Sequence, residues 1–159
     1  MRNLSIYLKS LIFAVWSAIS PGVGRGGDGP AIALATAQTI AAATSYVYGS
    51  PEEDASVMAY WAWHESNLNL RAVNPTERSW GAWQQDASVA KGQPAIVQAT
   101  AWYRHLQYGV GRCKNPAAIM WGRCNFKLVV TPFGTAEDAA DKRVTKARDL
   151  LAQVETLGD

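Results

Sequence analysis

Histidine and cysteine are scarce in this sequence, which contains two of each among its 159 residues. His64 and His105 lie far apart, and Cys113 and Cys124 have no histidine close by. Tetrahedral zinc sites take four such ligands at short spacings, so we expect no metal. The glycine-rich segment 21–30 resembles a phosphate-binding loop only superficially, because no strand precedes it and no Lys-Ser or Lys-Thr closes it. We therefore expect no cofactor.

Two further scarcities exclude classes of partner. Fifteen basic residues against thirteen acidic ones leave a net charge of +2, and the basic residues are scattered, so no nucleic-acid partner is expected. The apolar run that begins at Leu11 breaks at Ser17, far short of the roughly 20 residues that a spanning helix needs. We expect no stable membrane span.

The sequence is otherwise that of an ordinary globular domain, with 48% hydrophobic and 18% charged residues. Helical periodicity dominates it, so the predicted class is all-α with at most a short β element. Irregular or short β structure is expected only at 69–78, and the connector 127–134 contains residues 128–130, which could be extended. Helices are expected at 31–48, 50–65, 94–108 and 116–121, and a last one follows the Thr135 cap, its charges forming a solvated face.

The N-terminal segment allows two interpretations. Residues 1–20 carry a short apolar core and small residues near Ala18, as a cleaved signal peptide does. They also show apolar residues at three- and four-residue steps, as a packed helix does, and we favour the packed helix. We expect residues 1–29 to form this helix and a glycine-rich linker, followed by a domain at 30–159.

One acidic residue stands at the end of the most apolar helix. Ser50 as N-cap, Pro51 at the first helical position and Glu53 three residues after the cap predict the helix start. From Ala55 to Trp63 nearly every residue is apolar, and Glu65 follows on the same face. Apolar packing there disfavours the charged form of the carboxyl, which is what a general acid needs near neutral pH.

The segment after this helix carries a resemblance. The motifs are Glu65-Ser66-Asn67, then Ala72-Val73-Asn74-Pro75, then Ser79-Trp80-Gly81-Ala82-Trp83-Gln84. They resemble the catalytic region of soluble lytic transglycosylases with a lysozyme-like fold, in which a Glu-Ser pair precedes a Gly-Leu-Met-Gln segment. The resemblance covers residues 50–145. Alanine and tryptophan replace leucine and methionine here, and Trp121-Gly122 stands where the family has a tyrosine near the acid.

The resemblance implies cleavage of peptidoglycan glycan strands between N-acetylmuramic acid and N-acetylglucosamine, without hydrolysis. Glu65 would protonate the glycosidic oxygen while the sugar's own acetamido group attacks the anomeric carbon. Glu65 would then remove a proton from the 6-hydroxyl, which closes a 1,6-anhydro ring. Ser66 and Gln84 would hold the acetamido group, and Trp83 and Trp121 would contact the sugar. His64 is interpreted as a structural or rim residue.

Three alternatives stay open. Glu65 could be structural, paired with Arg71, Arg78 or Arg104. The chain could be a hydrolytic muramidase with Glu77 or Asp86 as its second carboxylate. It could also be a non-catalytic glycan-binding subunit of a phage tail or secretion apparatus.

The resemblance implies work outside the cytoplasm, in the periplasm or cell wall or on a phage virion. A disulfide could form there between Cys113 and Cys124, and we weigh it evenly against two free thiols.

Overall fold

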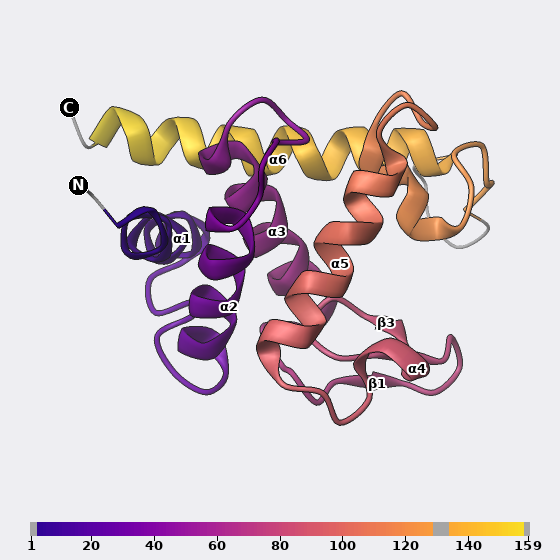
Figure 1. Cartoon of the computed structure of the whole chain (residues 1–159), viewed down its shortest axis with the longest axis horizontal. Coiled ribbons are helices and arrows are strands. Elements are labelled where there is room, and N and C mark those ends of the chain that lie inside the picture. The colour runs from indigo at the N-terminus through magenta and orange to yellow at the C-terminus, as the bar shows by residue number, and fades with distance from the viewer. Residues whose placement is uncertain (1–2, 129–133, 158–159) are drawn as a thin grey trace.

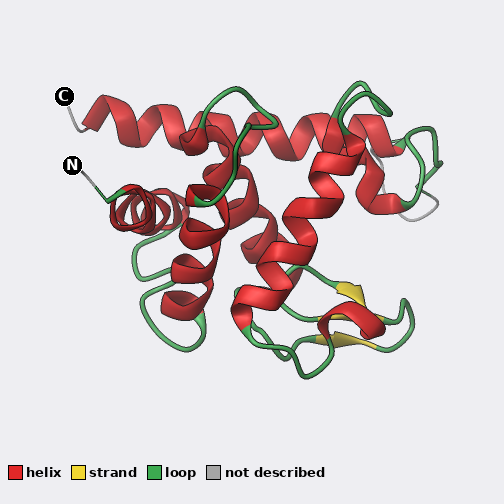
Figure 2. Cartoon of the chain, in the orientation of Figure 1, coloured by secondary structure: helices red, strands yellow, loops and turns green. Residues whose placement is uncertain are grey.

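A computed structural model describes residues 3–128 and 134–157, and it is mainly helical with one small sheet (Figure 2). This confirms the mainly α class with a short β element. The elements in chain order are α1 (Leu4–Ile19), α2 (Gly29–Ala41), α3 (Pro51–Ser66), β1 (Val73–Asn74), β2 (Ser79–Trp80), β3 (Gln85–Asp86), α4 (Ala87–Ala90), α5 (Ala95–Gly109), the 3-10 helix η1 (Pro116–Trp121) and α6 (Ala136–Leu157).

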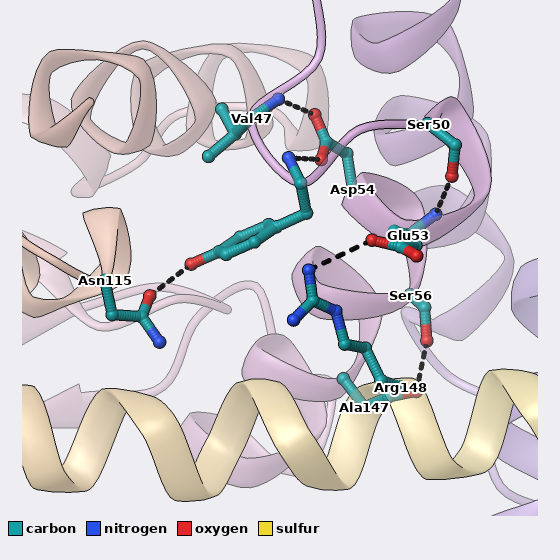
Figure 3. Close-up of polar contacts among 9 residues, drawn as sticks. Val47, Ser50, Glu53, Asp54, Ser56, Asn115, Ala147 and Arg148 are labelled. Atoms are coloured by element: carbon teal, nitrogen blue, oxygen red, sulfur yellow. Dashed lines mark hydrogen bonds and ion pairs between the residues drawn. The ribbon is translucent and has the colours of Figure 1, made fainter. Parts of the chain in front are cut away.

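Helix α3 lies at the centre of the core. It packs against α1, α2 and α6, and every residue from Asp54 to Ala62 is buried. Its N-terminus is capped as predicted, because the Ser50 hydroxyl accepts a hydrogen bond from the Glu53 backbone N–H at 3.1 Å (Figure 3). Helix α6 runs along one side of the molecule, and the small sheet lies away from it (Figure 1). The acid at the end of α3 is therefore carried by a helix whose central residues are buried in the core.

Helix α1 belongs to the common core, which supports its interpretation as a packed helix. Leu8, Ile12, Val15 and Trp16 are fully buried against α2, α3 and α6. The indole N–H of Trp16 also donates to the Ala59 carbonyl of α3 at 3.0 Å. Within residues 3–128 and 134–157, no helix has both the length and the apolar character needed to cross a bilayer.

Helix α2 is shorter than expected, ending at Ala41 rather than near Tyr48. The reason is the Asp54 carboxylate at the start of α3. It accepts backbone N–H bonds from Val47 and Tyr48, both at 2.8 Å (Figure 3). These N–H groups would otherwise bond within a helix, so the side chain competes successfully with the alanine-rich helical propensity.

The sheet is antiparallel with strand order β1–β2–β3. Val73 pairs with Trp80, and Trp80 pairs with Gln85. The expected range 69–78 includes β1, but β2 and β3 extend the β structure beyond it. Strands β2 and β3 were not predicted, because each has only two residues and neither has an alternating apolar pattern. Turns rather than a buried face set their pairing.

The C-terminal third is organised by caps and one disulfide. Asn115 caps η1, and Thr135 caps α6 by accepting from the Asp138 N–H at 3.2 Å, both as expected. Cys113 and Cys124 form a disulfide with Cα atoms 5.4 Å apart, which decides between bridge and free thiols. Of the predicted extended segment 128–130, residues 129 and 130 lie outside the described residues.

Candidate active site

A groove of about 440 Å³ opens between the end of α3, the small sheet, α5 and η1. Four of the five residues predicted for the site line it: Glu65, Trp83, Gln84 and Trp121. The other lining residues are Trp61, Glu77, Arg78, Ser79, Gln85, Asp86, Val89, Trp102, His105, Met120 and Gly122. Its volume lies within the range of about 300 to 1,000 Å³ that is usual for ligand pockets.

Glu65 reaches the groove because α3 ends immediately after it. The C-cap Asn67 adopts a left-handed conformation with φ of 54°, which turns the chain away and leaves the Glu65 side chain 23% exposed. Its carboxylate forms an ion pair with Arg143 of α6. Arg71, Arg78 and Arg104, the partners considered from the sequence, are not the ones used.

Arg143 contradicts the expectation that the charges of the last helix form a solvated face. Its side chain is only 15% exposed. The guanidinium carbon lies 4.7 Å from the ring centroid of Trp61 and 5.1 Å from that of Trp121. The two indoles therefore hold Arg143 against Glu65, since a cation is attracted to aromatic faces.

The ion pair changes the expected environment of the acid. A guanidinium offers only hydrogen-bond donors, so Oε1 of Glu65 acts as an acceptor in this contact. Glu65 is thus not the unpaired acid in an apolar setting that the sequence predicted. Arg143 contacts Oε1, and Oε2 accepts no hydrogen bond from any residue that the structure describes, so Oε2 is the oxygen left for a substrate.

Gln84 presents a hydrogen-bond acceptor to the groove. Its amide N–H₂ group donates to the carbonyls of Ala72 (3.2 Å) and Gly81 (2.9 Å). The amide oxygen accepts no hydrogen bond from any residue that the structure describes, so it is available to a ligand N–H. Gly81 is required beside it: φ is +83°, and a Cβ there would lie 2.2 Å from the Gln98 side-chain oxygen.

The two tryptophans of the predicted site differ. Trp83 is 2% exposed, and its indole N–H donates to the Met58 carbonyl at 3.0 Å, so it forms the floor of the groove and has no donor left for a ligand. Trp121 is partly exposed on η1, but its ring packs 5.5 Å from that of Trp61. Trp121 therefore serves as a wall that also supports Arg143.

Ser66 is not brought together with the other four residues. Its hydroxyl donates to the Ala62 carbonyl at 3.0 Å and accepts from the Asn69 N–H at 3.1 Å. Both bonds close the end of α3, and Ser66 is not among the groove-lining residues. Ser66 is therefore a polar residue that closes the end of the helix, and it does not line the groove as a ligand-binding residue would.

The groove contains two further carboxylates, Glu77 and Asp86. Asp86 caps α4 by accepting from the Ser88 hydroxyl and backbone N–H, and these bonds lower the pKa of its carboxyl. His105 also lines the groove, and partial burial lowers its pKa. His105 was not predicted from the sequence, because it belongs to no motif. Its spacing of three residues from Trp102 on α5 is the one available signal, since it places both residues on the same face of the helix.

His64 lies outside the groove lining, in agreement with a structural or rim role. Its ring packs 5.9 Å from that of Tyr60 and 6.5 Å from that of Trp63. Burial lowers the pKa of His64, and Arg143 lowers it further. The neutral imidazole is therefore favoured beside the ion pair.

In comparisons with known proteins, no protein-family model, no curated protein and no solved structure matches the chain.

Proposed function

We propose that this chain is a lytic transglycosylase with a lysozyme-like arrangement. It cleaves the glycan strands of bacterial peptidoglycan between N-acetylmuramic acid and N-acetylglucosamine, and it leaves 1,6-anhydromuramoyl ends. Glu65 is the single acid and then the base, and the reaction takes place outside the cytoplasm or on a phage virion. The Cys113–Cys124 disulfide suits such an oxidising setting.

The observation that carries this proposal is that Glu65 and Gln84 line one groove. The amide oxygen of Gln84 is free to accept the N–H of a sugar acetamido group, which would orient that group for attack on its own anomeric carbon. The partly exposed face of Trp121 offers an apolar surface for a sugar ring. The sugar then supplies the nucleophile, and the protein supplies the proton.

Arg143 contributes to the proposed mechanism after the proton transfer. It contacts Oε1 of Glu65, which leaves Oε2 to carry the proton to the glycosidic oxygen. The indoles of Trp61 and Trp121 hold Arg143 in this place. When Glu65 becomes a carboxylate again, the same cation would stabilise it while the anhydro ring closes.

A hydrolytic muramidase is the second candidate, because Glu77 and Asp86 line the same groove. Asp86 is a carboxylate at neutral pH, and its lowered pKa suits an electrostatic stabiliser better than a base. A non-catalytic glycan-binding subunit is the third, and the ion pair at Glu65 favours it.

Mass spectrometry of digested peptidoglycan separates these functions. We expect anhydro-ended muropeptides from the wild type and a rate at least about a hundredfold lower from Glu65→Gln, the usual scale for loss of a general acid. Glu155→Gln, an exposed carboxamide change on α6, is the matched control and should digest at the wild-type rate.

Other products would identify the other functions. Reducing ends, together with loss of activity in Asp86→Asn or Glu77→Gln, would establish hydrolysis instead. Wall binding by both wild type and Glu65→Gln without any digestion would show that the chain is a binding subunit.

A further inference from the structure

A second cavity, of about 630 Å³, lies next to the small sheet and shares no lining residue with the groove. Successive side chains of a strand point to opposite faces, and in β2 Ser79 lines the groove while Trp80 lines this second cavity. The remaining lining residues are Asp28, Leu70, Arg71, Gly81, Ala90, Lys91, Gly92, Gln93 and Pro94. We call it the Trp80 pocket.

The Trp80 pocket gathers hydrogen-bond donors that the fold does not use. Within residues 3–128 and 134–157, the guanidinium of Arg71, the side-chain amide of Gln93 and the indole N–H of Trp80 have no hydrogen-bond or ion-pair partner. The Lys91 ammonium lies 4.6 Å from the Trp80 ring centroid, on an exposed and flexible side chain. Donors of both cationic and neutral type therefore line one cavity.

The charge of the Trp80 pocket is opposite to that of the groove. The groove lining carries Glu65, Glu77 and Asp86 against one cation, Arg78. The pocket lining carries Arg71 and Lys91 against Asp28, and one oxygen of that carboxylate already accepts the Leu70 N–H at 2.9 Å. The pocket is thus suited to an anionic ligand.

Two features define the chemistry of that ligand. An indole face packs against the apolar face of a pyranose ring. An arginine and a lysine at the same cavity bind a carboxylate, the arginine with two parallel N–H bonds. A sugar ring bearing a carboxylate satisfies both.

We propose that the Trp80 pocket binds a muramoyl unit without a stem peptide through its free lactyl carboxylate, at a site separate from the cleavage groove. This choice of sugar rests on the proposed function, since muramic acid is the sugar of peptidoglycan that has a lactyl carboxyl, and this group is a carboxylate wherever no stem peptide is attached to it. The carboxylate lies between Arg71 and Lys91, and the pyranose ring takes the place of the Lys91 side chain over Trp80. The pocket would hold a neighbouring strand while the groove acts on another.

The test follows the seven indole N–H signals in ¹H–¹⁵N spectra, and Trp80→Phe identifies the Trp80 signal by its loss. We expect N-acetylmuramic acid to shift the Trp80 signal saturably. N-acetylglucosamine, the same ring without the lactyl carboxylate, should bind at least about tenfold more weakly, on the scale of a charge-assisted hydrogen bond. The dipeptide D-Ala-D-Ala, a carboxylate without the sugar, should also bind more weakly.

Charge-removing variants assign the contacts. Arg71→Gln and Lys91→Gln should each weaken binding of N-acetylmuramic acid by about threefold to tenfold, because each removes one cation at a partly solvated site. Lys146→Gln, an exposed cation on α6, should leave it unchanged. Equal binding of the neutral sugar or of the dipeptide, no response of the Trp80 signal, or indifference to both variants would overturn the proposal.

The outcome is separable from that of the proposed function. Glu65→Gln should bind N-acetylmuramic acid at the Trp80 pocket as the wild type does, because the two cavities share no residue. Peptidoglycan cleavage without a Trp80 response would remove only the second site. A Trp80 response in a protein that cleaves no glycan would remove only the enzymatic function.

Discussion

Breaking the ion pair between Arg143 and Glu65 should destabilise the protein far more than breaking a solvated one. The relevant change is Arg143→Met, which keeps much of the side-chain volume and removes the charge. Glu65 would then be a carboxylate with 23% exposure and no cationic partner. Arg148 lies on α6 like Arg143 and supplies a matched comparison. It pairs with Glu53 of α3, and its guanidinium carbon also lies over an aromatic ring, 5.2 Å from the centroid of Tyr48.

The expected size follows from burial. Exposed ion pairs contribute about 0.2 to 1 kcal/mol, whereas removing one partner of a buried pair costs about 3 to 5 kcal/mol. With side chains 15% and 23% exposed, the Arg143 pair falls between these limits, at about 1 to 3 kcal/mol. Loss of the contacts with Trp61 and Trp121 adds about 0.5 to 1 kcal/mol each. Arg143→Met should therefore lower the free energy of unfolding by about 2 to 5 kcal/mol.

Urea denaturation of a double-mutant cycle isolates the pairwise part. The cycle combines Arg143→Met with Glu65→Gln, and its control combines Arg148→Met with Glu53→Gln. The side chains of the control pair are 49% and 34% exposed, so its coupling should stay below about 1 kcal/mol and vanish in 1 M salt. The coupling between Arg143 and Glu65 should persist in salt. A coupling no larger than that of the control would refute the argument from burial.

Two further predictions concern the support of the site. Tyr103→Phe removes an O–H that donates to the buried Asp54 carboxylate at 2.5 Å, so urea denaturation should show a loss of about 1 to 3 kcal/mol, whereas Tyr108→Phe at an exposed position should change stability little. Burial lowers the pKa of His64 and His105 from their ordinary value of 6.5. The unfolded chain therefore binds more protons as the pH falls from 6.5 through the folded pKa, and stability should decline over that window. Unfolding measured at several pH values should show this slope reduced in His64→Gln and His105→Gln, and an unchanged slope in both variants would contradict the assignment.

Local signals in the sequence predicted most helix boundaries. Ser50, Asn115 and Thr135 act as N-caps where the sequence places them, and α5 begins one residue from its expected start. The error at α2 arose because the Asp54 carboxylate, a tertiary partner, captures the N–H groups of residues 47 and 48. Propensity describes the isolated segment, and a buried carboxylate at the next helix overrides it.

The part of the candidate site that could be predicted is the part whose residues lie close together in the sequence. Glu65 and Gln84 are 19 positions apart, and a helix end followed by tight turns returns the second to the first. The requirement for glycine at position 81 is also visible in the structure, because its positive φ and the close Gln98 oxygen exclude a side chain. Trp83, in contrast, carries no signal that separates a groove floor from a groove wall, since either place suits a large apolar ring.

Arg143 could not be predicted from periodicity. It lies 78 positions after Glu65, next to the buried Val144, on a helix whose other charged residues include exposed ones such as Arg148. Its burial depends on two indoles, one from α3 and one from η1, that come together only in the folded chain. Burying a cation at this site costs desolvation free energy. Contacts with the two indole rings and with the Glu65 carboxylate offset that cost. The acid of the groove thus depends on the C-terminal helix, and any mechanism for Glu65 has to include Arg143 at its Oε1.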